Sequence, residues 1–107
     1  MITAPLRVAG AAVATALAGS AAFATPALAA EGEVVSGTNL TVRYGPTTAS
    51  RAVGSVPPGT NLEIVCKVRG TSVDGNDLWY LLPPSLNEWV SARYVENVGA
   101  APGFCND

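Results

Sequence analysis

The sequence predicts an all-β fold, a small β-barrel of five to six short strands that follows a cleaved N-terminal export segment. Two observations lead to this prediction. Short apolar stretches alternate with polar residues at the two-residue period of β-strands, and Gly-Pro, Pro-Gly and Asp-Gly turns separate these stretches. After residue 29, no stretch keeps the periodicity of an amphipathic helix.

Residues 1–29 have the three parts of a secretory signal peptide. They begin with a basic region at Arg7, continue with an apolar run over residues 8–23, and end with the small-residue triplet Ala27-Leu28-Ala29. A retained membrane anchor is the alternative, but the run is rich in Ala and interrupted by Gly. We therefore expect cleavage before Ala30 and a secreted or cell-wall-associated protein with no stable membrane anchor.

The remaining residues, 30–107, are expected to form one small domain. Cleavage removes one of the six basic residues and none of the eight acidic ones, so the domain carries a net charge of −3. A domain of this charge has no basic field that attracts nucleic acid or anionic lipid. We expect a monomer that needs no cofactor.

The first clear strand signal is the run Asn39–Arg43, where Leu40 and Val42 alternate with polar residues before Gly45-Pro46 stops the strand. A type II turn is predicted at residues 57–60, because Pro58 presets φ at its second position and Gly59 accepts the positive φ of its third.

The turn leads into residues 62–69, which are predicted to form one long half-buried strand. Every even position in this run is apolar, so Cys66 is expected to face inward. The strand is expected to end at Gly70, and Asp74-Gly75 is the centre of a predicted hairpin.

Three short elements complete the predicted sheet. Residues 78–82 are rich in β-formers and form the return strand, and residues 88–91 form another strand. Residues 92–94 fit a single 3₁₀ turn, after which Val95 closes the sheet.

Two cysteines, Cys66 and Cys105, are expected to form one intramolecular disulfide in the oxidising compartment to which the export segment leads. The closed loop of about 40 residues corresponds to roughly 4 kcal/mol in the chain-entropy model. A redox pair and a metal pair are the alternatives, but the chain has no histidine and no Cys-x-x-Cys spacing. The bridge would tether the tail, where Phe104 is expected to cover an apolar patch.

The residue inventory argues against an enzyme and against a metal site. Without histidine, general base catalysis would fall to carboxylates in predicted loops or strand edges, with no apolar pocket to shift their pKa. Residues 74–77 offer oxygen ligands, but their spacing fits a hairpin tip and lacks the ligand pattern of a calcium loop.

Four residues are candidates for ligand binding: Tyr44, Tyr80, Arg43 and Trp89. Aromatic rings offer apolar area and a polar tip at low entropic cost, and Tyr44 lies where a strand opens into a loop. Trp79 and Tyr80 alternate, so one ring should face the core and the other, Tyr80, the surface. Trp79 and Trp89 are expected in the core rather than at a site, because a small barrel needs a few large side chains to fill it, and Trp89 is kept as the lesser candidate. Arg43 is expected on the outward side of its strand, where it would orient a carboxylate or remain solvated.

From Val35 to about Asn97, the order of these motifs resembles a bacterial SH3 (SH3b) domain. The resemblance is carried by Asn39–Arg43 with Gly45-Pro46, by Val53–Val56 with Pro58–Thr60, and by Trp79-Tyr80, Trp89-Val90 and Tyr94-Val95. The paired cysteines resemble a disulfide-stapled secreted branch. Glu88 stands where the family usually has Gly before the tryptophan, which affects the expected ligand geometry.

The resemblance implies an SH3-like β-barrel that recognises bacterial cell-wall peptide (peptidoglycan) or a cell-surface partner and catalyses no reaction. The alternative is a small secreted protein that binds another protein, such as a protease inhibitor. Residues 83–87 are the only stretch suited to a rigid inhibitory loop.

Overall fold

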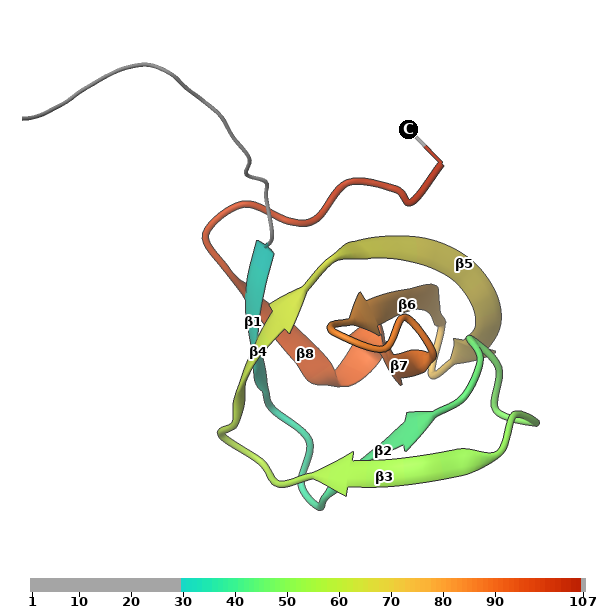
Figure 1. Ribbon diagram of the computed structural model, residues 1–107. Helices are drawn as coiled ribbons and strands as arrows, with labels where there is room; N and C mark the ends of the chain where they lie inside the picture. The colour runs from blue at the N-terminus through green and yellow to red at the C-terminus, as the bar shows by residue number, and fades with distance from the viewer. Residues whose placement is uncertain (1–29, 107) are drawn as a thin grey trace, which may run out of the picture.

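The computed structural model describes residues 30–106, which form eight β-strands and one 3₁₀ turn (Figure 1). The predicted signal peptide lies outside the described residues. The strands are β1 (Ala30–Val34), β2 (Leu40–Arg43), β3 (Ala52–Val56), β4 (Asn61–Ile64), β5 (Cys66–Val73), β6 (Asn76–Leu82), β7 (Glu88–Ser91) and β8 (Val95–Val98), and the turn is η2 (Ala92–Tyr94). None of the described residues belongs to a helix long and apolar enough to cross a bilayer.

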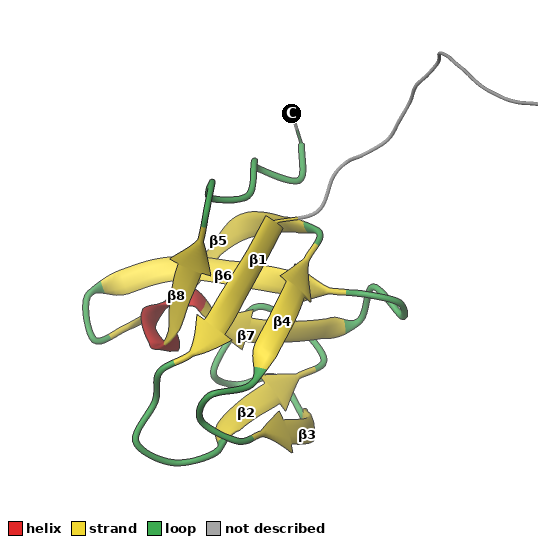
Figure 2. Ribbon diagram, turned by 90° about the vertical axis from the view of Figure 1, so that its left-hand side faces the viewer, coloured by secondary structure: helices red, strands yellow, loops and turns green. Residues whose placement is uncertain are grey.

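The strands form two antiparallel sheets, with the orders β4-β1-β8 and β3-β2-β7-β6-β5. Figure 2 shows the three-stranded sheet lying across the face of the five-stranded one. The all-β class is confirmed, but the predictions of five to six strands and of a closed barrel are wrong, because the two sheets keep separate edges. Eight short strands satisfy the backbone by pairing within each sheet, and side chains between the sheets form the core.

The predicted long strand over residues 62–69 is in fact two strands in different sheets. β4 ends at the fully buried Ile64, and β5 begins at Cys66. Between them, Val65 is 40% exposed and its N–H donates to the carbonyl of Leu81 at 2.8 Å. The apolar period continues across this break, so the alternation gives no sign that the chain changes sheets.

Two turn predictions are confirmed. The N–H of Thr60 donates to the Pro57 carbonyl at 3.3 Å, and Gly59 has a φ of 86°. Asp74 and Gly75 both have positive φ values, 49° and 89°, which is the geometry of a type I′ hairpin. β5 continues past Gly70 to Val73, with a register shift after Arg69, so the hairpin arms are longer than predicted.

The core lies between the two sheets. Its buried side chains come from every strand except β3 and β5, and the cluster consists of Val34, Leu40, Val42, Ile64, Tyr80, Leu82, Val90, Ala92 and Val95. All residues of β3 before Val56 are exposed. β3 therefore extends the sheet beyond the core.

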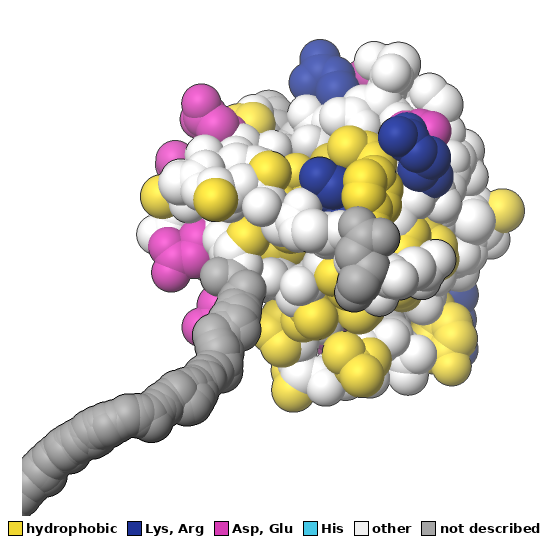
Figure 3. Space-filling view, turned by 90° about the horizontal axis from the view of Figure 1, so that it is seen from above, with side chains coloured by type: hydrophobic (Ala, Val, Ile, Leu, Met, Phe, Trp, Pro, Cys, Tyr) yellow, Lys and Arg dark blue, Asp and Glu magenta, His cyan; other side chains and the backbone are white. Residues whose placement is uncertain are grey.

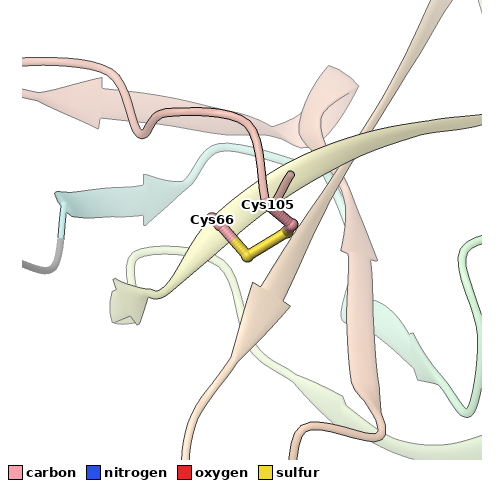
Figure 4. Close-up of a disulfide and its surroundings, with 2 residues drawn as sticks. All are labelled: Cys66 and Cys105. Carbon is pink, nitrogen blue, oxygen red and sulfur yellow. A yellow bond between two sulfur atoms is a disulfide. The ribbon is translucent and has the colours of Figure 1, made fainter. Parts of the chain in front are cut away.

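The Cys66–Cys105 disulfide is confirmed, and Figure 4 shows it joining β5 to the tail. The tail pairs with the edge of β5 in parallel: the N–H of Lys67 donates to the Gly103 carbonyl at 3.0 Å, and the N–H of Cys105 donates to the Lys67 carbonyl at 2.9 Å. This pairing covers the outer edge of β5, an edge that otherwise leaves backbone groups open to another strand.

The prediction that Cys66 faces the core is wrong. Cys66 is half-buried and pairs with Leu81, which lies on the face of β6 opposite the core residues Tyr80 and Leu82. The change of sheet at Val65 accounts for this difference, because the alternation set by Ile64 does not carry over into the second sheet.

Candidate functional site

A row of cross-strand neighbours crosses the face of the five-stranded sheet that points away from the core. Arg43 pairs with Trp89, Trp89 with Leu81, and Leu81 with Cys66. Directly paired residues project from the same face of a sheet, and their chain neighbours Val42, Val90 and Tyr80 all lie in the core. The structure therefore brings two of the four candidates, Arg43 and Trp89, side by side.

Arg43 anchors the loop that follows β2. Its Nη1 donates to the Ser50 carbonyl at 2.9 Å, and the N–H of Tyr44 donates to the Arg51 carbonyl at 2.8 Å. Inside the loop, the hydroxyls of Thr47 and Ser50 lie 2.6 Å apart. Arg43 is half-buried, and the acceptor of its hydrogen bond is an uncharged carbonyl. Its first role is therefore to hold the loop beside the sheet.

Tyr44 is exposed, as predicted, with half of its surface accessible. The guanidinium carbon of Arg51 lies 5.0 Å from the centre of its ring, within the range of a cation–π contact. This contact limits the freedom of the ring without burying it. Tyr44 follows Arg43 directly in the chain and lies in the loop that Arg43 holds beside the sheet. We call the sheet surface with Arg43 and Trp89, together with the adjoining loop that carries Tyr44 and Arg51, the outer face.

Trp89, the third of these candidates, is half-buried. Trp89 pairs with Arg43 on one neighbouring strand and with Leu81 on the other, and Leu81 is only 8% exposed. A half-buried indole next to an arginine offers a flat apolar surface beside a positive charge, which suits a peptide bearing a carboxylate.

The prediction that Tyr80 lies on the surface is wrong. Tyr80 is 5% exposed and belongs to the core, where its hydroxyl and the Asn97 side chain exchange hydrogen bonds at 3.0 to 3.2 Å. Burial raises the pKa of the Tyr80 hydroxyl, and the bond to Asn97 partly offsets this rise. A ligand therefore does not reach this ring.

Both faces of β6 are covered, which explains why Trp79 and Tyr80 are both buried. On the face opposite Tyr80, Trp79 is 2% exposed, and its indole N–H donates to the Thr71 carbonyl at 2.8 Å. The loop after β2 closes over this region, because the N–H of Thr71 donates to the Pro46 carbonyl at 3.3 Å. At Gly70, a Cβ would collide with that carbonyl and lie 2.9 Å from the Trp79 ring, so the close approach requires glycine.

The hydroxyl of Tyr94 donates to the Asp74 carboxylate at 2.7 Å. This hydrogen bond, reinforced by the negative charge of Asp74, raises the pKa of Tyr94. The bond ties the hairpin tip to η2, so it gives Asp74 a structural partner. Within residues 30–106, no three His, Cys, Asp or Glu side chains gather as a metal site would require.

A second group of side chains was not predicted. Lys67 and Arg69 of β5 lie over the ring of Phe104, at 4.8 Å and 5.5 Å from its centre. The sequence contains a signal for this arrangement, because Lys67 and Phe104 each neighbour a cysteine of the disulfide. The bridge brings these neighbours together.

A family model described as bacterial SH3 domain matches residues 38–96, which is more than half of the chain. β1 and the tail with Cys105 lie outside the match. No curated protein has a sequence similar enough to this chain to count as a relative. On the family match, the chain belongs to the bacterial SH3 domain family.

Proposed function

We propose that this protein is an exported, non-catalytic module that binds bacterial cell-wall peptide through its outer face. The observation that carries the proposal is the pairing of Arg43 with Trp89 on the face away from the core, next to the loop that carries the exposed Tyr44. Membership of the bacterial SH3 family supports binding as the type of activity. The signal-like segment and the disulfide support export, because structural disulfides persist in oxidising compartments.

The outer face has the chemistry that a wall peptide needs. Aromatic rings pack against amide planes and short aliphatic side chains, and a guanidinium pairs with carboxylate groups. Tyr44 and Trp89 supply the rings, and Arg51, stacked on Tyr44, supplies an exposed cation. Arg43 is engaged with the Ser50 carbonyl, so Arg51 is the better placed of the two to meet a ligand carboxylate.

The test compares peptidoglycan pull-down with thermal unfolding for alanine variants of exposed residues. Tyr44→Ala should weaken binding roughly thirtyfold, the equivalent of about 2 kcal/mol at an interface anchor. Its unfolding midpoint should stay near that of the parent because the ring is half exposed. Leu86→Ala is the matched control, since Leu86 is 57% exposed on a different loop. Equal binding by parent and Tyr44→Ala would contradict the proposal.

A second function is favoured by the loop between β6 and β7. Leu86 is exposed and has a φ of 65°, a left-handed conformation that costs energy for a branched side chain and is often found at functional sites. A loop that presents such a residue suits contact with a secreted protein, including a protease. In a protease panel, Leu86→Ala would then abolish inhibition and Tyr44→Ala would preserve it, the opposite of the pattern expected for wall binding.

A further inference from the structure

The tail and the edge of β5 border a pocket at the edge of the five-stranded sheet opposite β3. The pocket has a volume of about 330 Å³ and is lined by Lys67, Val68, Arg69, Phe104, Cys105 and Asn106. We call it the tail pocket. Figure 3 looks onto this end of the molecule and shows basic side chains beside apolar ones.

Backbone hydrogen bonds join the two walls of the tail pocket at Lys67. Both the N–H and the carbonyl of Lys67 are used by the tail, at Gly103 and Cys105. The Cys66–Cys105 bridge holds the two walls together. The polar side-chain groups of the lining residues are the Lys67 ammonium, the Arg69 guanidinium and the Asn106 amide.

The charge in the tail pocket is positive, although the domain as a whole is negative. Arg69 has a partner, since its Nη1 lies 3.1 Å from a carboxylate oxygen of Asp77, an exposed pair that contributes little stability. Lys67 makes no salt bridge to any residue between 30 and 106. Among the described residues, the only partner shown for the Lys67 ammonium is the Phe104 ring, a contact that leaves its positive charge unneutralised.

The apolar part of the tail pocket indicates which kind of anion the pocket would bind. Phe104 offers an aromatic ring next to the cations, which suits a carboxylate attached to a small apolar group. A free phosphate or sulfate would leave this apolar surface without a partner. The α-carboxylate of a terminal alanine has both parts, the charge for Lys67 and a methyl group for Phe104.

We propose that the tail pocket binds the free C-terminal carboxylate of a short peptide that ends in a small apolar residue. Phe104, Cys105 and Asn106 lie outside the family match, so the pocket is built on a segment that follows the matched domain. The proposal deepens the function proposed above, on which it rests for the natural source of the peptide. The tail pocket would be a second contact site, separate from the outer face.

The test uses acetyl-Ala-Ala with a free carboxylate and its C-terminal amide as probes, titrated into the oxidised protein of residues 30–107. Amide chemical shifts locate binding, and calorimetry measures affinity. The acid should shift the signals of Lys67, Arg69, Phe104 and Asn106, and should bind at least about tenfold more tightly than the amide, as expected for a charge-assisted hydrogen bond. Inorganic phosphate serves as the simple anion.

Lys67→Gln should remove most of this preference for the acid, and Phe104→Leu should weaken the binding of both probes. Arg93→Gln is the matched control, because Arg93 also lies over an aromatic ring, at 5.2 Å from the centre of Tyr94, but outside the tail pocket. Equal affinity for acid and amide, an equal loss in Arg93→Gln, or tighter binding of phosphate than of the acid would overturn the proposal.

The two proposals fail separately. If Lys67→Gln binds the acid as the parent does while Tyr44→Ala loses peptidoglycan, the tail pocket is wrong and the outer face stands. If the acid binds at the tail pocket but peptidoglycan retains neither the parent protein nor its Tyr44→Ala variant, the pocket is right and the proposed source of the peptide is wrong.

Discussion

Removal of the Cys66–Cys105 bridge is expected to lower the free energy of unfolding by about 4 kcal/mol. The two cysteines are 39 positions apart, and the chain-entropy model gives this value for the loop that they close. At about 0.05 to 0.15 kcal/mol per residue, a 78-residue domain has a total stability of roughly 4 to 12 kcal/mol. Loss of the bridge therefore removes from a third to all of that stability.

The thermal consequence is large because the domain is small. For domains of 60 to 100 residues, each kcal/mol shifts the unfolding midpoint by about 4 to 8 °C, so the shift should reach roughly 15 to 30 °C. Circular dichroism melts of the oxidised protein with and without a phosphine reductant measure it. The double variant Cys66→Ala/Cys105→Ala serves as the control, because its midpoint should match that of the reduced protein and not respond to reductant.

Two results would refute this reasoning. A shift of less than about 4 °C would show that the closed loop contributes little in the unfolded chain. Titration of two free thiols in the native secreted protein would show that the bridge does not form there. Reduction should also release the tail from Lys67, since only two backbone hydrogen bonds and the Phe104 contacts would remain to hold it.

Three further outcomes are expected. Gly70→Ala should cost about 1 to 3 kcal/mol in urea unfolding, because its Cβ would collide with the Pro46 carbonyl; Gly54→Ala, with nothing within 4 Å, should cost little, and equal costs would contradict the packing argument. The raised pKa of Tyr80 means that the unfolded state loses this proton first, so stability should fall as pH rises above about 10 toward the folded-state pKa; a Tyr80→Phe variant that falls equally steeply would exclude this cause. N-terminal sequencing of the secreted protein should begin at Ala30, and recovery of only the uncut chain would contradict the signal prediction.

Local chemistry explains the parts of the fold that could be predicted. The turn at Gly59 and the hairpin at Asp74-Gly75 depend on residues that accept positive φ within a few positions of the chain. The 3₁₀ turn and the strand before it are equally local, as Ser91 caps the turn by accepting from the N–H of Arg93. The disulfide needed only a count of cysteines, because two cysteines allow a single intramolecular pairing.

For the candidate site too, local sequence was enough to place some residues and not others. Tyr44 could be placed on the surface because a strand end beside Gly45-Pro46 leaves a ring little chance of burial. The burial of Tyr80 could not be predicted in this way. Alternation shows that Trp79 and Tyr80 lie on opposite faces of the strand, but it does not show whether other parts of the chain cover both faces. Only the approach of Pro46 to Gly70 and Thr71 shows that both faces of β6 are covered.

Residue types and short spacings are enough to predict the all-β class, the turns, the disulfide pairing and the family. Three features become visible only in the folded chain: the change of sheets at Val65, the open edges of the two sheets, and the pairing of Arg43 with Trp89. The folded chain also places Lys67 against Phe104. These features depend on which strands pair across long stretches of chain, and a two-residue period is the same whichever partner a strand finds.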